Sequence, residues 1–313
     1  MNRSRFINAL GKLALAAIVA VELLAPSASL ASAPKRVELT VSAAISLTAP
    51  LQAIAKLYEK RHPAFSVALN LGASGILEQQ IEEGAPADIF ISASPREMNE
   101  LEKQSLIRAA SRRNLVSNIL VLVCPQGELG ITSFRNLVLP RVKRVAIANP
   151  ESVPAGMYAK QALEYFKVFK EVEPKLLLAG DVRQALAYAE TGDADAAIVY
   201  LTEAKLSKRV RVVATAPAAS HAPVVYPVAV LQRSREAAAA KQFVDFLSGR
   251  EAQQVFEREG FGPPGKALTP SAKPPIEKQD PPSSRGGGES RRLTGAGARR
   301  GQGRIITEGR GAA

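Results

Sequence analysis

Short apolar runs rich in β-branched residues alternate with segments of helical periodicity along most of this chain, and no other feature constrains the fold as strongly. Residues 37–43 form the first run, and apolar residues then recur at helical spacing from Leu47 to Tyr58. Because Pro50 is tolerated only in the first turn of a helix, this helix must begin close to Ser46. The alternation predicts an α/β protein with a mostly parallel sheet.

Further elements follow from the same patterns. Strands are predicted at residues 66–71, 88–92, 142–148, 196–200, 210–214 and 224–231. Helices are predicted after Gly75, with Ile76, Leu77 and Ile81 on the core face, from Ala155, from Asp181, and over 234–261. A second unit opens after the apolar run at 115–125. Two extended segments, near Asn118 and near Tyr226, can carry the chain to a second lobe and back.

Both ends of the chain differ in composition from its body. Basic residues precede an apolar run at 13–24 and a small-residue stretch, which is the pattern of a cleaved secretory signal peptide, assigned here to 1–31. That run is shorter than the roughly 20 residues of a membrane-spanning helix. Residues 263–313 are rich in Gly, Pro and Arg and nearly lack large apolar side chains, so we expect a disordered tail.

Several classes of function are disfavoured by what the sequence lacks. The net charge is +12, but half of this excess lies beyond residue 262 and the body has no basic run, so we predict no nucleic-acid surface. Cys124 is the only cysteine and lies in an apolar run, which excludes an internal disulfide and favours a buried thiol. His62 and His221 are expected to be solvated, and no common catalytic motif occurs. We therefore predict that the protein is not an enzyme.

Four strand-to-helix turns are rich in small residues and are the natural places for a ligand. They lie at residues 43–48, 72–75, 153–156 and 180–183. Ligands of open α/β sheets bind outside the carboxyl ends of the strands, and helix N-termini offer free amides and a positive dipole end. The turns therefore predict an anion site. Taken alone, Ser46 and Ser74 can equally be ordinary helix N-caps.

The order of these turns and the residues around them resemble the periplasmic molybdate-binding proteins, the family often called ModA. The matching segments are residues 43–48, 80–92, 149–160, 181–186, 198–200 and 226–230. The Gly-Ala-Pro-Ala-Asp segment at 84–88 and the Val-Pro-Ala-Gly segment at 153–156 are the most characteristic. The resemblance, which covers about 37–262, implies a two-lobed α/β Venus-flytrap fold with two crossover strands. One lobe would comprise 32–118 plus 226–262, and the other 119–225.

The resemblance also implies a ligand and the residues that bind it. The ligand positions of the family fall on Ser46, Ser74, Ala155, Val182 and Tyr200. The serines would offer hydroxyls and amides, Ala155 and Val182 backbone amides, and Tyr200 its hydroxyl, so that molybdate or tungstate bridges the two lobes. No cofactor and no directly coordinated metal are expected. The implied protein is an exported, monomeric, periplasmic subunit that delivers the anion to the permease of an ABC transporter.

Two alternatives remain open from the sequence. One is a binding protein for sulfate or another small anion, and the other is an exported serine hydrolase that uses Ser74. A set made only of donors disfavours phosphate, because the proton that phosphate carries would find no acceptor. It does not separate molybdate from sulfate, which is also a fully ionised tetrahedral dianion.

Overall fold

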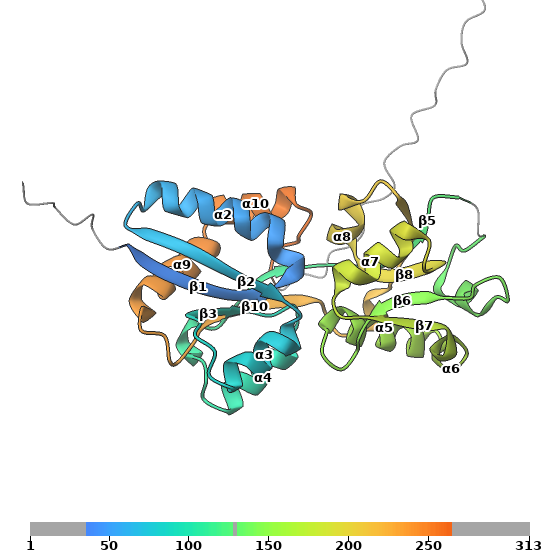
Figure 1. The fold of residues 1–313 in the computed structure, drawn as a ribbon, viewed down its shortest axis with the longest axis horizontal. Helices are drawn as coiled ribbons and strands as arrows, with labels where there is room; N and C mark the ends of the chain where they lie inside the picture. The colour runs from blue at the N-terminus through green and yellow to red at the C-terminus, as the bar shows by residue number, and fades with distance from the viewer. Residues whose placement is uncertain (1–35, 128–129, 265–313) are drawn as a thin grey trace, which may run out of the picture. The chain divides into compact units, whose positions relative to one another are not determined.

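The computed structural model describes residues 36–127 and 130–264, whose strands form two five-stranded sheets (Figure 1). The first sheet contains β1 (Val37–Ala44), β2 (Phe65–Gly72), β3 (Ile89–Ile91), β4 (Arg113–Ser117) and β10 (Val225–Val230). The second contains β5 (Leu120–Pro125), β6 (Val145–Ala148), β7 (Leu176–Ala179), β8 (Ala196–Tyr200) and β9 (Val210–Thr215).

The strand order is β2-β1-β3-β10-β4 in the first sheet and β7-β6-β8-β5-β9 in the second. In each sheet the first three strands of this order are parallel, and the fourth is antiparallel to both of its neighbours. The two halves of the protein therefore repeat one topology. Because parallel strands end at the same edge of a sheet, each sheet gathers several strand-to-helix turns at one edge.

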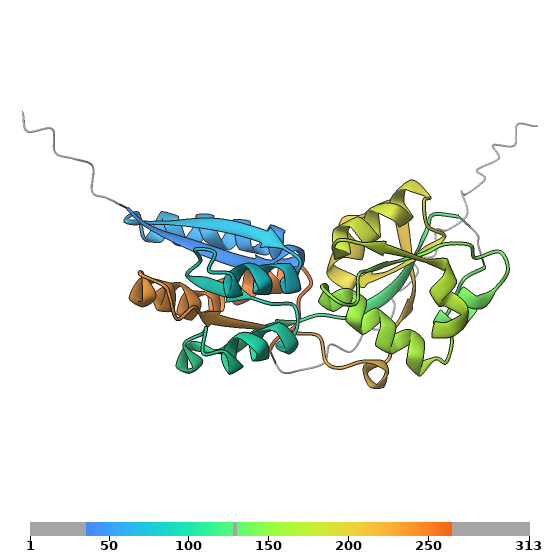
Figure 2. The ribbon, with the colours of Figure 1, turned by 60° about the horizontal axis from the view of Figure 1, so that its bottom comes forward.

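Helices cover both faces of each sheet (Figure 2). Those beside the first sheet are α2 (Thr48–Arg61), α3 (Ser74–Glu82), α4 (Pro95–Lys103), α9 (Ala237–Leu247) and α10 (Arg250–Arg258), with the 3-10 turns η1 (Ile45–Leu47) and η2 (Ala109–Ser111). Those beside the second sheet are α5 (Pro154–Tyr165), α6 (Phe169–Val172), α7 (Val182–Thr191) and α8 (Leu201–Leu206), with η3 (Phe134–Val138), η4 (Glu173–Lys175) and η5 (Ala218–Ser220).

The chain passes between the two sheets twice. It leaves the first sheet after Ser117 and enters the second at Leu120, and it returns between Thr215 and Val225. The amide of Asn118, on the outward crossing, donates to the carbonyl of Val224, on the return crossing, at 3.1 Å. The two crossings are therefore hydrogen-bonded to each other.

Most predicted elements are confirmed, including the helix that starts near Ser46. Pro50 lies in the first turn of α2, where its missing N–H has no intrahelical acceptor to lose, and Leu51, Ile54 and Tyr58 form the buried face. Cys124 is fully buried in β5, and burial raises the pKa of its thiol to about 11.

Some expectations about the helices and strands are wrong. Ile76 is 44% exposed, because the inward face of α3 follows the i, i+4 pair Leu77 and Ile81, and Ile76 precedes that face by one residue. The helix predicted over 234–261 is two helices, because the backbone turns extended at Gly249, the N-cap of α10. The strand predicted from residue 142 begins at Val145.

Among the α-helices and strands, β7, α4, α6 and α8 were not predicted, and neither were the 3-10 turns η2, η3, η4 and η5. The predicted signal peptide and all but the first two residues of the predicted tail lie outside the described residues. Within the described ranges, no helix is both long enough and apolar enough to cross a membrane.

Candidate functional site

A small cavity lies among the strand-to-helix turns of both sheets, and all five residues singled out from the sequence line it. The empty space there, including its opening, is about 210 Å³. The lining residues are Ala44, Ile45, Ser46, Gly72, Ala73, Ser74, Ala93, Val153, Pro154, Ala155, Val182 and Tyr200. None of these side chains is charged. An anion in this cavity would therefore meet neutral hydrogen-bond donors.

Ser74 is the first residue of α3 and is almost fully buried. Its Oγ accepts a hydrogen bond from the backbone amide of Ala93 at 3.0 Å. A hydroxyl has one proton to give, and this bond leaves that proton unused. Ser74 does not cap α3, whose N-cap is Ala73, so the N-cap interpretation of this serine is wrong.

Ser46 lies in the 3-10 turn η1, and its buried hydroxyl contacts the hydroxyl of Tyr226 at 3.0 Å. Tyr226 is fully buried in β10 and also accepts from the side-chain amide of Asn118 at 3.3 Å. Ser46 likewise makes no N-cap hydrogen bond. The sequence patterns did not mark Tyr226 or Asn118 as site residues, although both lie on the extended segments that were expected to connect the lobes.

The second sheet presents helix starts to the cavity. Pro154 is the first residue of α5 and has no N–H, so the first available amide of that helix belongs to Ala155. At α7 the side chain of the N-cap Asp181 accepts from the amide of Gln184 at 2.9 Å, and Val182 is the first helical residue. Amides in the first turn of a helix have no intrahelical acceptor, so both helices direct donors toward the cavity.

Tyr200 ends β8 and is 1% exposed. Its hydroxyl is buried and has no hydrogen-bond partner among the described residues. Burial raises the pKa of Tyr200 well above its usual value, so the phenol keeps its proton. A buried hydroxyl without a partner is costly. Tyr58 also has one, in the core of the first half, but only the Tyr200 hydroxyl belongs to a residue that lines the cavity, where a ligand can supply the missing partner.

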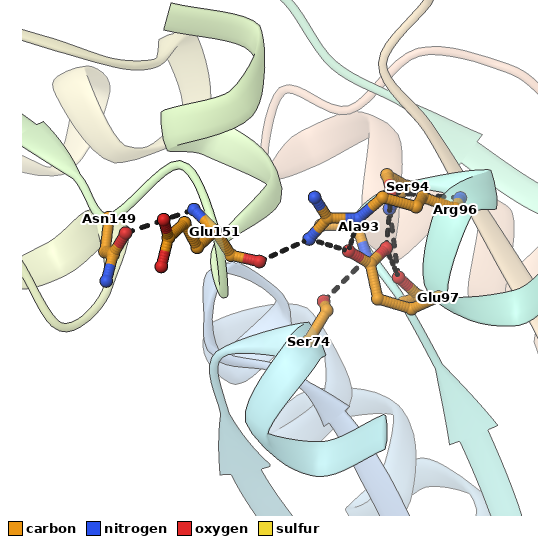
Figure 3. A network of polar contacts seen from close by, with 8 residues as sticks. Ser74, Ala93, Ser94, Arg96, Glu97, Asn149 and Glu151 are labelled. Atoms are coloured by element: carbon orange, nitrogen blue, oxygen red, sulfur yellow. Dashed lines mark hydrogen bonds and ion pairs between the residues drawn. The ribbon is translucent and has the colours of Figure 1, made fainter. Parts of the chain in front are cut away.

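The loop between β6 and α5 contacts the part of the chain that contains the first sheet. The carbonyl of Ser152 accepts from the amide of Gly75 at 3.0 Å. The carbonyl of Glu151 accepts from the Arg96 guanidinium at 2.9 Å (Figure 3). The Asn149 side chain shapes this loop by accepting from the amide of Glu151 at 3.1 Å. These contacts lie beside the cavity and join its two sides.

Two buried carboxylates flank the site and differ in how well they are satisfied. Glu97, in α4, accepts from Ser92, Ser94 and Arg96, and both of its oxygens have partners. Glu203, in α8, has an ion pair with Arg183 at 3.4 Å, and its Oε1 has no partner among the described residues. Burial raises the pKa of Glu203 to about 7, against the lowering effect of Arg183.

The described part of the chain contains neither a metal site nor a histidine that lines the cavity. No group of His, Cys, Asp and Glu there could hold a metal ion. Neither histidine lines the cavity: His62 packs on the ring of Tyr58, and His221 contacts the carbonyl of Ala222 at 2.7 Å. His221 is half-buried rather than solvated, and burial lowers its pKa. Ser74 thus has no histidine beside it to act as a general base.

Comparison with known proteins gives a consistent set of relatives. A family model for the bacterial extracellular solute-binding proteins matches residues 39–262. The chain is 42% identical over 229 residues to the molybdate-binding protein ModA of Escherichia coli, covering 72% of this chain and 88% of that protein. It is 40% identical over 249 residues to the putative ABC transporter substrate-binding lipoprotein YvgL of Bacillus subtilis, covering 79% of this chain and 95% of the relative.

Solved structures include a similar fold. The periplasmic molybdate-binding protein of Azotobacter vinelandii superposes with a TM-score of 0.66 at 25% sequence identity, covering 72% of this chain and 99% of that one. The predicted class, an α/β fold of two lobes typical of periplasmic binding proteins, is confirmed.

Proposed function

Because the chain belongs to the family of bacterial extracellular solute-binding proteins, we propose that it captures molybdate or tungstate between its two lobes and delivers the anion to an ABC transporter. The ligand is proposed from the chemistry of the cavity together with the relatives that are named for molybdate binding. The single observation that carries the proposal is the buried hydroxyl of Tyr200, which lines this uncharged cavity without a partner.

The proposed ligands of the anion are the five lining residues singled out above. Ser46 and Ser74 belong to the half with the first sheet, whereas Ala155, Val182 and Tyr200 belong to the half with the second, so one anion would hold the two together. Each hydrogen bond to a charged oxygen contributes roughly 1.5 to 3 kcal/mol. Such a set offsets an association cost of about 4 to 15 kcal/mol and supports micromolar to nanomolar binding.

The remaining features of the proposal follow from this role. The protein would be a binding protein rather than an enzyme, exported by a cleaved signal peptide to the periplasm, and monomeric, with a transporter permease as its partner. The proposed lobes are residues 32–118 plus 226–262 and residues 119–225. The two crossings at Asn118 and before Val225 support these boundaries, because each lies between strands of different sheets.

A thermal-shift series with molybdate, tungstate, sulfate and phosphate tests the function. A ligand that binds only the folded protein stabilises it by mass action, so molybdate and tungstate should each raise the melting temperature by several degrees, while sulfate and phosphate at equal concentration should not. An equal shift with sulfate would reassign the protein to sulfate. No shift with any of the four would remove the oxyanion assignment.

A further inference from the structure

The side-chain amide of Asn118 has an orientation that its neighbours fix. Its Oδ1 accepts from the amide of Ile119 at 2.8 Å, so its nitrogen must be the donor to its other contacts. That nitrogen donates one proton to Oγ1 of Thr202 at 2.9 Å and one to the Tyr226 oxygen at 3.3 Å. Thr202 belongs to α8 and Tyr226 to β10, so Asn118 joins both halves of the protein at the outward crossing.

This orientation decides the direction of the hydrogen bond between Tyr226 and Ser46. The Tyr226 oxygen already accepts from Asn118, and burial keeps the phenol protonated by raising its pKa. Its proton has one acceptor among the described residues, the Ser46 Oγ at 3.0 Å. If Ser46 donated instead, a buried phenol proton would have no acceptor, which costs free energy. Tyr226 is therefore the donor, and the Ser46 proton is left to face the cavity.

Ser74 has the same arrangement with a different donor. The amide of Ala93 donates to its Oγ at 3.0 Å, so the Ser74 hydroxyl also keeps its own proton for the cavity. The two serines are oriented by separate groups. Ser46 is oriented by hydrogen-bonded side chains that begin at Asn118, and Ser74 is oriented by the backbone amide of Ala93, which follows β3. Both arrangements occupy one of the two lone pairs of the hydroxyl oxygen and leave its proton free to donate.

We propose that Asn118 and Tyr226 are positioning residues, which hold the Ser46 hydroxyl as a donor toward the cavity and thereby make the site selective for anions that carry no proton. The proposal rests on the function proposed above and assigns two residues that do not line the cavity. A serine hydroxyl can donate one hydrogen bond and accept two. With one lone pair taken by Tyr226, the Ser46 hydroxyl keeps its proton for the cavity and has less capacity to accept there. That penalises hydrogenphosphate, whose proton needs an acceptor, but not molybdate or sulfate.

Tyr226→Phe is the first test, because it removes the donor to Ser46 and keeps the buried ring. Calorimetric titrations would use molybdate, sulfate and phosphate at a mildly alkaline pH, where phosphate is the hydrogenphosphate dianion. We expect molybdate affinity to fall about ten-fold, from the loss of one oriented bond to a charged oxygen. We expect the ratio of molybdate to hydrogenphosphate affinity to narrow by a similar factor, since Ser46 can then rotate and accept.

Tyr158→Phe is the matched control. Tyr158 is also a buried tyrosine, and its hydroxyl donates to the carbonyl of Pro223 at 3.3 Å, but it does not line the cavity. Its loss should lower the melting temperature and leave the affinity ratio unchanged. Equal behaviour of the two variants would mean that Tyr226 has only a structural role.

Asn118→Asp tests the direction of the relay. The carboxylate still accepts from the amide of Ile119, but it has no proton to donate to Tyr226 and instead accepts a hydrogen bond from the Tyr226 hydroxyl. Ser46 must then donate its hydrogen bond to the Tyr226 oxygen. The lone pairs of Ser46 therefore turn toward the cavity. A purely electrostatic effect of the new charge would weaken molybdate and hydrogenphosphate alike, because both are dianions. The relay predicts that molybdate binding weakens about ten-fold more than hydrogenphosphate binding does.

The outcomes separate this inference from the proposed function. If the unmodified protein binds molybdate and both variants leave the molybdate-to-hydrogenphosphate ratio unchanged, the relay is wrong and the function stands. If the unmodified protein binds none of the anions, the proposed function is wrong instead.

Discussion

The two halves of this protein share a strand order and differ in how they present hydrogen-bond donors. Beside the first sheet the donors are the hydroxyls of Ser46 and Ser74, and each has its oxygen held by a protein group. Beside the second sheet they are amides at the starts of α5 and α7 and the Tyr200 hydroxyl, which has no partner among the described residues. One half is arranged before a ligand arrives, whereas the other contains a group that a ligand would complete.

The same contrast holds for the buried carboxylates. Glu97, beside the first sheet, has partners for both oxygens, whereas Glu203, beside the second, has one oxygen without a partner among the described residues. Each unsatisfied buried group needs its own explanation, and such groups also occur beside the first sheet, at the Tyr58 hydroxyl and at Oε2 of Glu251. We infer that a shared topology fixes where the turns lie, while local partners decide which donors at the cavity are already held by the protein without ligand.

The largest expected effect is that of Gly156→Ala, which tests folding of the second half. A Cβ there would collide with the backbone of Ala148 and Asn149, within the same half of the protein. Overpacking against backbone should cost about 3 kcal/mol of unfolding free energy, measured by urea titration. A loss below about 0.5 kcal/mol, the range of ordinary surface substitutions, would show that the α5 start is not closely packed.

Gly75→Ala tests a close contact between the two halves, as Gly156→Ala tests one within a single half. Its Cβ would lie 2.6 Å from the carbonyl of Ser152, so it would obstruct the approach of the β6–α5 loop while leaving α3 free to fold. We expect unchanged unfolding free energy and about ten-fold weaker molybdate binding, equivalent to roughly 1.4 kcal/mol. Loss of stability without loss of affinity would place this contact within the folding core rather than between two halves that close on a ligand.

Ser74→Ala and Tyr200→Phe compare a prearranged donor with an unpartnered one. Each removes a hydroxyl from the cavity and should cost about 1.5 to 3 kcal/mol of molybdate binding, by calorimetry. Without ligand their effects should be opposite. Ser74→Ala strips the Ala93 amide of its acceptor and should lower stability, whereas Tyr200→Phe removes an unpartnered buried hydroxyl and should raise it by about 1 kcal/mol.

Two results would contradict this contrast. Unchanged affinity in both variants, with correct folding, would take Ser74 and Tyr200 out of the site. A fall in ligand-free stability for Tyr200→Phe would mean that its hydroxyl makes an interaction in the folded protein without any ligand.

The smallest expected effect concerns the pH dependence of Glu203. Burial raises its pKa from 4.5 to about 7, so its contribution to stability is fully present below about pH 4.5 and is lost as pH rises through about 7. Glu203→Gln should remove this loss of stability at high pH, because glutamine does not ionise. The variant also loses the ion pair with Arg183, so above about pH 7 we expect a net gain of about 1 kcal/mol in unfolding free energy over the native protein.

Glu97→Gln is the control for that experiment. Because both Glu97 oxygens accept hydrogen bonds, its replacement should destabilise the protein. If thermal unfolding of Glu203→Gln followed the same pH profile as the native protein, Glu203 would not be the group that titrates.

Much of the fold can be read from local sequence, because apolar periodicity and the restrictions on proline act over a few residues. Pro50 located the start of the first helix, and the span of β8 was predicted to the residue. The short elements α6 and α8 were missed because one or two turns give too little periodicity to detect. Ile76 was assigned to the core because a helix of nine residues leaves its inward face ambiguous until the sheet is in place.

The candidate site was also only partly predictable from local sequence. Small-residue turns and the family resemblance indicated five positions, and the fold brings all five to one cavity. What local sequence could not indicate are the partners that orient them: Tyr226 lies 180 residues from Ser46, and Asn118 lies 108 residues from Tyr226. No local pattern relates residues so far apart. The chain therefore specified which groups could donate, and only tertiary packing decided which proton each hydroxyl has left to give.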